Sequence, residues 1–287
     1  MRMRNAFAVL LLSLLSSSAL ADPLADGRAA MERRDWAAAA KAFEKAVAAN
    51  PKSAEAHYLL GGAYGRHAQE AGLLGKASLA KKAKAALEKA VELDPNHINA
   101  RQGLIDYYTF APSMLGGSME KALAQAAEIK KRDKHAGHRA YARIYMRQEK
   151  PALARKEMVD AVREDPNNAR AHHSLAMFYL NEKNYAAALH EFEMAQKLDP
   201  AFMPARLRIG NTLVVSGGDQ ARAERELRAY LTHKPAEDEP GLEHAWYWLG
   251  TLQEKQGRKA EAKQSFTNAN RLLPGDKNIT EALKRVK

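Results

Sequence analysis

The amino-acid sequence predicts an all-α protein, an α-solenoid of about seven helix–turn–helix units closed by a C-terminal capping helix. Three observations support this prediction: a period of 34 residues, alanine at two fixed positions of each second helix, and a proline that ends most units. Units of this kind bury their apolar faces only against their neighbours. The chain has no cysteine and 28% charged residues, which excludes a disulfide scaffold, Cys-ligated zinc and a membrane-spanning bundle.

The first 21 residues have the pattern of a secretory signal peptide. Arg2 and Arg4 precede an apolar run, Ala6–Leu15, and Ala19-Leu20-Ala21 offers a small-x-small cleavage site. The run is shorter than the roughly 20 residues of a transmembrane helix, and an uncleaved anchor is the alternative. Cleavage after Ala21 predicts a periplasmic or secreted chain without a stable membrane span. The formal net charge then falls from +11 to +9, because two arginines leave.

The repeat units follow in order after the signal. The clearest unit, 169–202, carries Leu175-Ala176 in its first helix, Phe192 in its second and Asp199-Pro200 at its end. The same positions recur in units at 22–52, 53–96, 97–134, 135–168, 203–236 and 241–274. The remaining residues, 275–287, predict the capping helix, because Ile279, Ala282, Leu283 and Val286 lie on one helical face.

Two units are longer than the period. The unit at 53–96 holds ten extra residues around His67–Ser78, and the unit at 97–134 holds five extra residues in Phe110–Ser118. Pro112 and the Gly116-Gly117 pair indicate a loop in the second case, and Ser118 is a candidate N-cap. Whether these insertions bind a partner is left open by the sequence.

These residues resemble the tetratricopeptide repeat, a two-helix unit of 34 residues, and the chain is similar to exported bacterial proteins built from it. The resemblance covers nearly all of the chain after residue 21. It implies a right-handed solenoid whose first helices line a concave groove that often holds peptides. The residues that match groove positions are Arg139, Arg143, Arg147, Arg170 and His173, with Tyr58, Gly62, Arg66, Gln102, Asp106, Tyr247, Thr251 and Lys255 in the other units.

Basic residues are concentrated in Lys134–Lys156, which holds seven cationic side chains and a single acid, Glu149. Arg139, Arg143 and Arg147 are four residues apart and so share one helix face. Like charges at this spacing destabilise a helix by about 0.2–0.5 kcal/mol per pair. The row therefore indicates one of two things. It binds an acidic peptide, a C-terminal carboxylate or a phosphate-bearing polymer, or Glu149, Glu157 and Asp160 neutralise it as a solvated face.

Motifs of enzymes are absent from the sequence. There is no GxSxG, GxGxxG or phosphate-binding GK[ST] loop, and Met194 replaces the second histidine of a zinc-protease motif that would begin at His190-Glu191. His135 and His138 are spaced to share a metal, but no third ligand accompanies them. We therefore expect no catalytic residue, no metal and no cofactor.

The sequence favours a non-enzymatic scaffold that binds a protein or an acidic peptide in the bacterial cell envelope. An accessory subunit of an envelope biogenesis or polysaccharide assembly machine is an alternative that the sequence does not separate from the first. A third hypothesis, a polyanion or nucleic-acid binder, is suggested by the isoelectric point near 9.6. The signal peptide and the lack of basic residues interleaved with exposed aromatics argue against it, so we expect no nucleic-acid partner.

Overall fold

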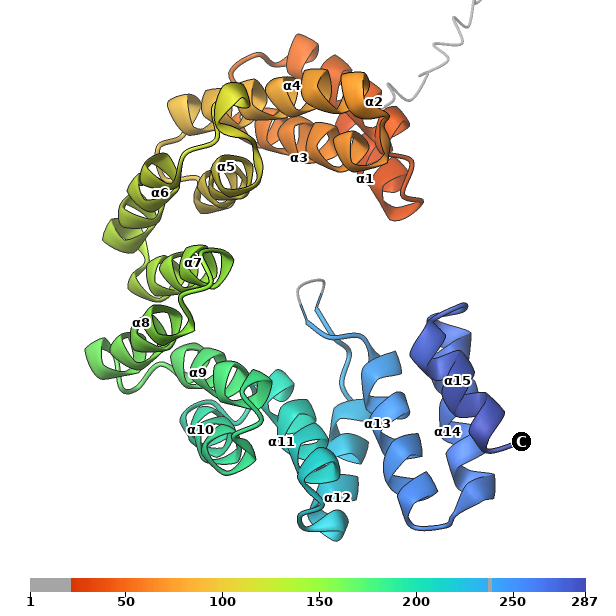
Figure 1. Cartoon of the computed structure of the whole chain (residues 1–287). Coiled ribbons are helices and arrows are strands. Elements are labelled where there is room, and N and C mark those ends of the chain that lie inside the picture. The colour runs from red at the N-terminus through yellow and green to blue at the C-terminus, as the bar shows by residue number, and fades with distance from the viewer. Residues whose placement is uncertain (1–21, 237–238) are drawn as a thin grey trace, which may run out of the picture. The chain divides into compact units, whose positions relative to one another are not determined.

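The structure is a computed structural model that describes residues 22–236 and 239–287 (Figure 1). The predicted signal peptide at 1–21 lies outside the described residues. Within the described part of the chain there are fifteen α-helices and one 3-10 helix, and there is no strand. The protein is an all-α helical repeat solenoid, as the period predicts.

The chain divides into two compact units, Met1–Gly117 and Ser118–Lys287. Unit 1 contains α1 (Pro23–Glu32), α2 (Trp36–Ala49), α3 (Ala54–Glu70), α4 (Leu73–Leu93), α5 (Ile98–Phe110) and η1 (Ser113–Leu115). Unit 2 contains α6 (Met119–Arg132), α7 (Lys134–Arg147), α8 (Pro151–Glu164), α9 (Ala169–Asn181), α10 (Tyr185–Leu198), α11 (Met203–Ser216), α12 (Gln220–Leu231), α13 (Leu242–Lys255), α14 (Lys259–Leu272) and α15 (Lys277–Arg285).

Helices pack in consecutive pairs within each unit. In unit 1, α1 packs on α2 and α3 on α4; in unit 2 the pairs are α7–α8, α9–α10, α11–α12 and α13–α14. First helices of neighbouring pairs also touch, α7 with α9 and α11 with α13. Helices α5 and α6, the expected third pair, belong to different units. The expected capping helix is α15, which packs on α14 and buries Ile279, Ala282 and Val286.

Many of the described helices begin at a capping side chain, whereas α4, α8, α11, α13 and α14 have no side-chain cap. The capping oxygen accepts a hydrogen bond from the backbone N–H three residues later, which satisfies one of the unpaired donors of the first turn. The residues that cap in this way are Asp35, Ser53, Ser118, Asp133, Asn168, Asn184, Asp219 and Asp276. The predicted cap at Ser118 is thus confirmed.

Five first helices end in the same left-handed turn. Gly217 and Gly257 adopt φ values of 71° and 75° there, while Arg34, Glu149 and Lys183 adopt φ values of 57–59°. A side chain in this region costs about 1–2 kcal/mol relative to the right-handed region. Because Glu149, Lys183 and Gly217 are spaced by the 34-residue period, the turn is a feature of the repeat.

Each repeat is held together by a close approach between a small residue of the first helix and a large apolar residue of the second. A Cβ added to Gly61 would lie 2.7 Å from Leu87 Cγ, one added to Gly210 would lie 2.7 Å from Leu227 Cγ, and one added to Gly250 would lie 2.7 Å from Phe266 Cε1. In α9 and α10 the same positions are held by Ala176 and Phe192, both fully buried. The predicted pairing of small and large residues is therefore the repeat's central contact.

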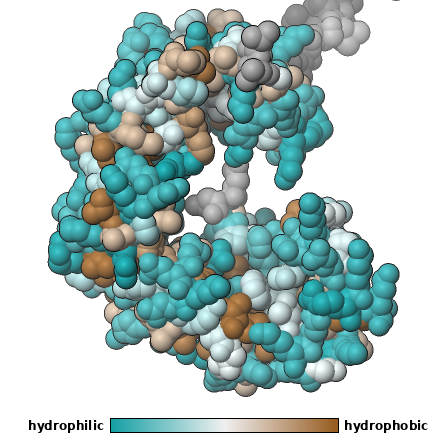
Figure 2. Space-filling model, viewed as in Figure 1, coloured by the Kyte–Doolittle hydropathy of each residue, from teal (hydrophilic) through white to brown (hydrophobic). Residues whose placement is uncertain are grey.

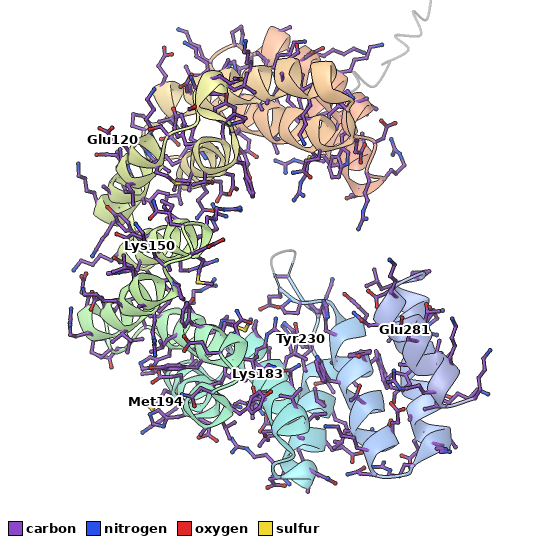
Figure 3. All side chains as sticks on the ribbon, in the orientation of Figure 1. Glu120, Lys150, Lys183, Met194, Tyr230 and Glu281 are labelled. Carbon is purple, nitrogen blue, oxygen red and sulfur yellow. The ribbon has the colours of Figure 1, made fainter. Side chains whose placement is uncertain are left out.

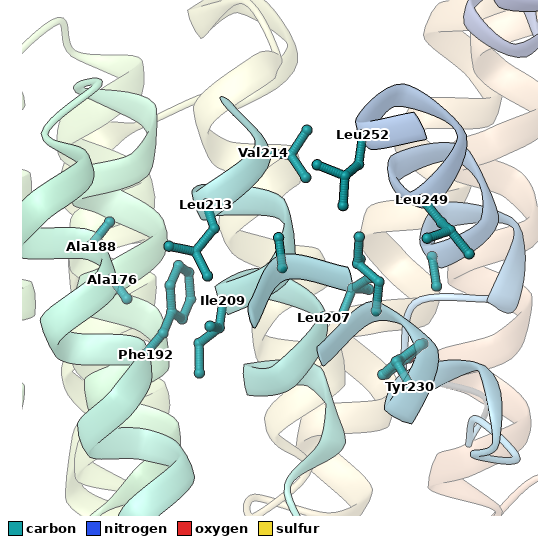
Figure 4. Close-up of a cluster of buried hydrophobic side chains, with 13 residues drawn as sticks. Ala176, Ala188, Phe192, Leu207, Ile209, Leu213, Val214, Tyr230, Leu249 and Leu252 are labelled. Carbon is teal, nitrogen blue, oxygen red and sulfur yellow. The ribbon is translucent and has the colours of Figure 1, made fainter. Parts of the chain in front are cut away.

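The large residue of one repeat also packs on the next repeat. Phe192 lies in one buried cluster with Ala176 and Ala188 of its own repeat and with Ile209 and Leu213 of α11 (Figure 4). The cluster continues through Tyr230 to Leu249 and Leu252 of α13. Burial of apolar area contributes about 25 cal/mol per Å², so stacking supplies the core that no repeat has alone.

Polar contacts repeat with the same period. His138 and His172 are buried and bind Glu157 and Glu191 of the paired helix at 2.8 and 2.6 Å. Second helices of successive repeats are joined by basic–acidic pairs, Lys130–Glu164, Arg222–Glu193 and Arg258–Glu224, at 3.0, 2.5 and 2.8 Å. These polar contacts orient the helices relative to one another, while the stability of the stack comes from apolar burial.

The two insertions take different conformations. The extra residues around His67–Ser78 lengthen α3 and α4, which are joined through Ala71 and Gly72 alone. The segment Phe110–Ser118 is the predicted loop, with η1 inside it and Gly116 in the left-handed region at φ 89°. The hydroxyl of Tyr107 donates a hydrogen bond to the carbonyl of Leu115 and ties this loop to α5.

The visible surface of each unit is mainly hydrophilic, with hydrophobic residues scattered over it (Figure 2). Among the described residues, no helix has both the length and the apolar character that crossing a bilayer requires.

We predict that Gly61→Ala lowers the free energy of unfolding by about 1–3 kcal/mol, because the added methyl group overlaps Leu87. Gly65→Ala in the same helix is the matched control, since its Cβ meets no atom within 4 Å. That control should raise stability by up to about 1 kcal/mol through helix propensity. Chemical denaturation followed by circular dichroism measures both variants. Equal effects of the two substitutions would contradict the close contact.

Candidate functional site

Five basic side chains gather on the first helices of three successive repeats in unit 2. We call them the Arg–His cluster: His135 and Arg139 on α7, Arg170 and His173 on α9, and Arg208 on α11. In unit 2, α7, α9 and α11 lie on the inner side of the arc of helices, and α8, α10 and α12 on its outer side (Figure 1). The residues of the cluster therefore belong to the helices that the resemblance places along the groove.

His173 is the member of the cluster that every other member influences. Burial, and then the charges of Arg208 and Arg139, lower the pKa of the His173 imidazole to about 3, with smaller effects of His135 and Arg170. Burial and the charge of Arg139 lower the pKa of His135 to about 4. Both imidazoles are therefore neutral at pH 7.

Arg139 is exposed to solvent and is nevertheless perturbed. Desolvation lowers the pKa of its guanidinium, and the charges of Arg143 and Arg170 lower it further. An exposed side chain loses part of its hydration when protein surrounds it on several sides. Arg139 thus lies close to two cations, Arg143 and Arg170, and to one acid, Asp133, which opposes their effect on its pKa.

Aromatic rings border the cluster. The guanidinium of Arg170 lies 5.6 Å from the ring centre of Phe202, and the imidazole of His173 lies 5.2 Å from the same ring. The centre of the buried Phe192 ring is 5.3 Å from that of His173. Between α7 and α9, Ser174 Oγ lies 3.3 Å from His135 Nε2. These contacts fix His135, Arg170 and His173 against α9 and the start of α11.

Of the three acids expected to neutralise the arginine row, two form ion pairs with other residues and the third lies in a turn. Glu157 binds His138 at 2.8 Å, and Asp160 binds Lys156 and Arg163 at 2.6 and 2.7 Å. Glu149 lies in the turn between α7 and α8. Two of the three acids are thus engaged away from the arginine row.

The other predicted residues lie apart from the cluster. Arg143 and Arg147 continue the row along α7, half-buried and exposed. Lys255 on α13 donates to the carbonyl of Val214 at 2.6 Å, and Tyr247 packs on Phe266. In unit 1, Tyr58 packs on His97, Arg66 lies 6.0 Å from the Trp36 ring, and Gln102 and Asp106 are half-buried on α5.

Sequence reasoning missed Arg208 and gave His135 a different role. Arg208 lies 34 residues after Ser174, not after His173, so the period places it one position away from the expected groove residues. In the sequence, His135 is a candidate only as a metal ligand that would share an ion with His138. His138 is buried against Glu157 and Glu164 instead, at 2.8 and 3.3 Å.

One tyrosine of α12, Tyr230, lies near Arg208 of the cluster. Tyr230 lies between α12 and the segment that leads into α13, and its hydroxyl donates to the carbonyl of Pro240 (Figure 3). Burial and the nearby Glu239 raise the pKa of Tyr230 to about 12. The phenol is therefore a neutral hydrogen-bond donor and no base.

Two shallow clefts lie elsewhere in unit 2. One of about 340 Å³ is lined by Trp246, Gln253 and Ser265, and one of about 190 Å³ by His244, Trp248 and Asn278. Neither is lined by a member of the Arg–His cluster. The cluster's side chains come from three first helices, an arrangement that fits a peptide or another macromolecule laid along those helices.

Comparison with protein families gives two matches. The model described as TRAP transporter T-component matches residues 27–194, more than half of the chain. The chain belongs to the TRAP transporter T-component family. A tetratricopeptide-repeat model matches residues 243–274, which cover α13 from its second residue and all of α14, so this T-component chain is also a tetratricopeptide-repeat protein.

Individual relatives agree on the fold. A tetratricopeptide-repeat and J-domain co-chaperone of Cryptococcus neoformans is 30% identical over 104 residues, 36% of this chain, and the chain spans 20% of that protein. The structure of a tetratricopeptide-repeat protein of Parabacteroides merdae has a TM-score of 0.54 at 15% identity, covering 92% of this chain and 97% of the other. Human IFIT1, solved as a dimer with m7Gppp-AAAA, has a TM-score of 0.59 at 19% identity, covering 92% and 61%. These structures show the fold alone.

The two cluster histidines predict an acid-dependent loss of stability. In the unfolded chain they bind protons with a pKa near 6.5, but in the folded chain only near pH 4 and 3. Below about pH 6.5 the unfolded state binds more protons, so stability falls as the pH falls. Between pH 7 and pH 5 the loss amounts to at most about 2 kcal/mol per histidine.

The double variant His135→Asn, His173→Asn should lose less stability than the wild type over this interval. Urea denaturation at pH 7 and pH 5 measures the difference. His244→Asn, at an exposed histidine of α13, is the control and should keep the wild-type loss. An equal loss in the double variant and the wild type would contradict the burial of these imidazoles.

Proposed function

We propose that the chain is a non-enzymatic binding component of a TRAP transport system in the periplasm of the cell envelope. The Arg–His cluster and the adjoining row on α7 hold an acidic segment of another component of that system. Membership of the T-component family supports the transport role and the location. The signal pattern at residues 1–21 supports export.

The observation that carries this proposal is the grouping of cations on α7, α9 and α11. Arg139, Arg170 and Arg208 come from three different repeats, and the pKa of the Arg139 guanidinium is lowered by desolvation and by its charged neighbours. A surface that holds like charges together against their repulsion is stabilised by a ligand of opposite charge. An acidic segment lying along the first helices supplies that charge.

The family description favours transport over polysaccharide assembly, the alternative that the sequence leaves open. A nucleic-acid ligand has less support, because the aromatic rings at the cluster, Phe192 and Phe202, pack against His173. They form no exposed platform on which successive bases stack.

We predict that Arg139→Glu combined with Arg170→Glu lowers recovery of the transporter partner at least tenfold in crosslinking within intact cells, read by mass spectrometry. The reversed charges repel the acidic segment. Arg225→Glu, at an exposed arginine of the second helix α12, is the matched control and should leave recovery unchanged. Circular dichroism of the purified variants checks their folding.

Equal recovery of the partner by the double variant and the wild type would overturn the assignment of the surface. Recovery of nucleic acid in place of a transporter component would overturn the transport role. Partner recovery that falls equally in the Arg225→Glu control would show that only net charge matters.

A further inference from the structure

Buried side-chain nitrogen atoms without a hydrogen-bond partner are concentrated in the Arg–His cluster. Among the described residues such atoms are His135 Nδ1, His138 Nε2, His173 Nε2 and Arg208 Nε. His138 Nε2 lies 3.3 Å from a carboxylate oxygen of Glu164, so an acceptor is near. The other three belong to the cluster. A buried N–H without an acceptor costs about 1–3 kcal/mol.

None of the three atoms has a hydrogen-bond partner within the described part of the chain. In the tautomer whose Nε2 accepts from the Ser174 hydroxyl, His135 carries its proton on Nδ1, and in the tautomer protonated on Nε2 the His173 ring is a donor at that atom. Arg208 Nε always carries hydrogen. The Arg208 N–H donor and the two imidazole nitrogens without partners come from α7, α9 and α11, and a group from outside the chain would satisfy them.

The charge at this place favours an anionic acceptor over water. Arg139, Arg170 and Arg208 are permanent cations around His173. The nearby acids that the structure describes have other partners: Asp133 caps α7 through Ala136 N, and Glu239 accepts from His233 at 2.5 Å and from Ala236 N at 3.0 Å. Asp133 acts on Arg139 and His135, and Glu239 acts on Arg170, so these two carboxylates offset part of the charge of the three guanidinium groups and leave the cluster net positive.

The apolar edge of the cluster narrows the class of anion. The Phe202 ring packs against both Arg170 and His173 and is half-buried. A carboxylate attached to an apolar group places its oxygens on the donors and its carbon atoms on this ring. Inorganic phosphate gains nothing from the ring, because all of its surface is polar.

We propose that the Arg–His cluster is a carboxylate-binding site for an organic ligand. His173 Nε2 and the Arg208 guanidinium donate to the carboxylate oxygens, Arg139 and Arg170 supply charge, and Phe202 contacts the apolar part of the ligand. The site rests on the proposed function, since it names the chemical group by which an acidic partner is held. Free organic acids and polypeptide C-termini both present that group.

The experiment is isothermal titration calorimetry of the wild-type chain at pH 7. The probes are 3-phenylpropionate, its uncharged amide 3-phenylpropionamide, and inorganic phosphate. We expect 3-phenylpropionate to bind at least tenfold more tightly than the amide and than phosphate. Binding of an acetylated Ala-Ala-Phe peptide with a free C-terminus that exceeds that of 3-phenylpropionate supports a polypeptide as the source of the carboxylate, and equal binding supports a free organic acid.

Variants locate the site. Arg208→Gln and His173→Gln should each weaken binding of 3-phenylpropionate at least tenfold, and Arg225→Gln on α12 is the matched control. If the variants do not fold, NMR of the wild-type His173 imidazole decides the question. Its pKa should rise when 3-phenylpropionate binds, because a carboxylate stabilises the imidazolium.

The site is overturned by equal binding of the acid and the amide, by phosphate binding as tightly as the acid, or by unchanged affinity in Arg208→Gln and His173→Gln. No binding of any carboxylate probe also overturns it. Arg139- and Arg170-dependent capture of the transporter partner would still stand in these cases, so failure of the site and failure of the proposed function remain distinguishable.

Discussion

The close contact between a small residue of each first helix and a large apolar residue of each second helix sets the geometry of the whole repeat. Gly61 against Leu87, Gly210 against Leu227 and Gly250 against Phe266 leave no room for a methyl group. Since close-packed interiors tolerate neither overlap nor voids, this contact fixes how near the two helices lie. The large residue then reaches the next repeat, as Phe192 does with Ile209, and fixes the stacking as well.

The chemistry of the surface follows from that stacking. Residues one period apart come to lie on neighbouring first helices, so Arg139 on α7 and His173 on α9 influence each other although 34 residues separate them. The same order that buries alanine and phenylalanine between the helices also brings basic groups of neighbouring first helices together. At the Arg–His cluster the cations repel one another and buried nitrogen atoms lack hydrogen-bond partners, whereas the core is closely packed. Local costs of this kind are typical of functional sites, where an external ligand supplies the missing partner.

The fold was predictable because the same contact between a small and a large residue recurs in successive repeats. The period, the small residues and the capping residues therefore all indicate the same helix boundaries and pairs. The two insertions show the limit: Pro112 and Gly116 mark the second as a loop, but around His67–Ser78 no residue distinguishes a loop from two longer helices, which is what forms. Of the residues in the proposed site, Arg139, Arg170 and His173 were expected from the resemblance to line the groove. Arg208 was not predicted because it follows Ser174 by one period, and only the stacking of α11 on the preceding pair of helices brings its charge near His173.

The central claim is that repeat stacking holds basic side chains together in a desolvated place with too little compensating charge. The pKa of the His173 imidazole, measured by NMR titration of the wild-type chain without ligand, tests it most directly. The account predicts that this imidazole stays neutral to below pH 4, in line with a pKa of about 3. A pKa near the ordinary value of about 6.5 would contradict it, because His173 would then be well solvated or already compensated by the chain's own acids.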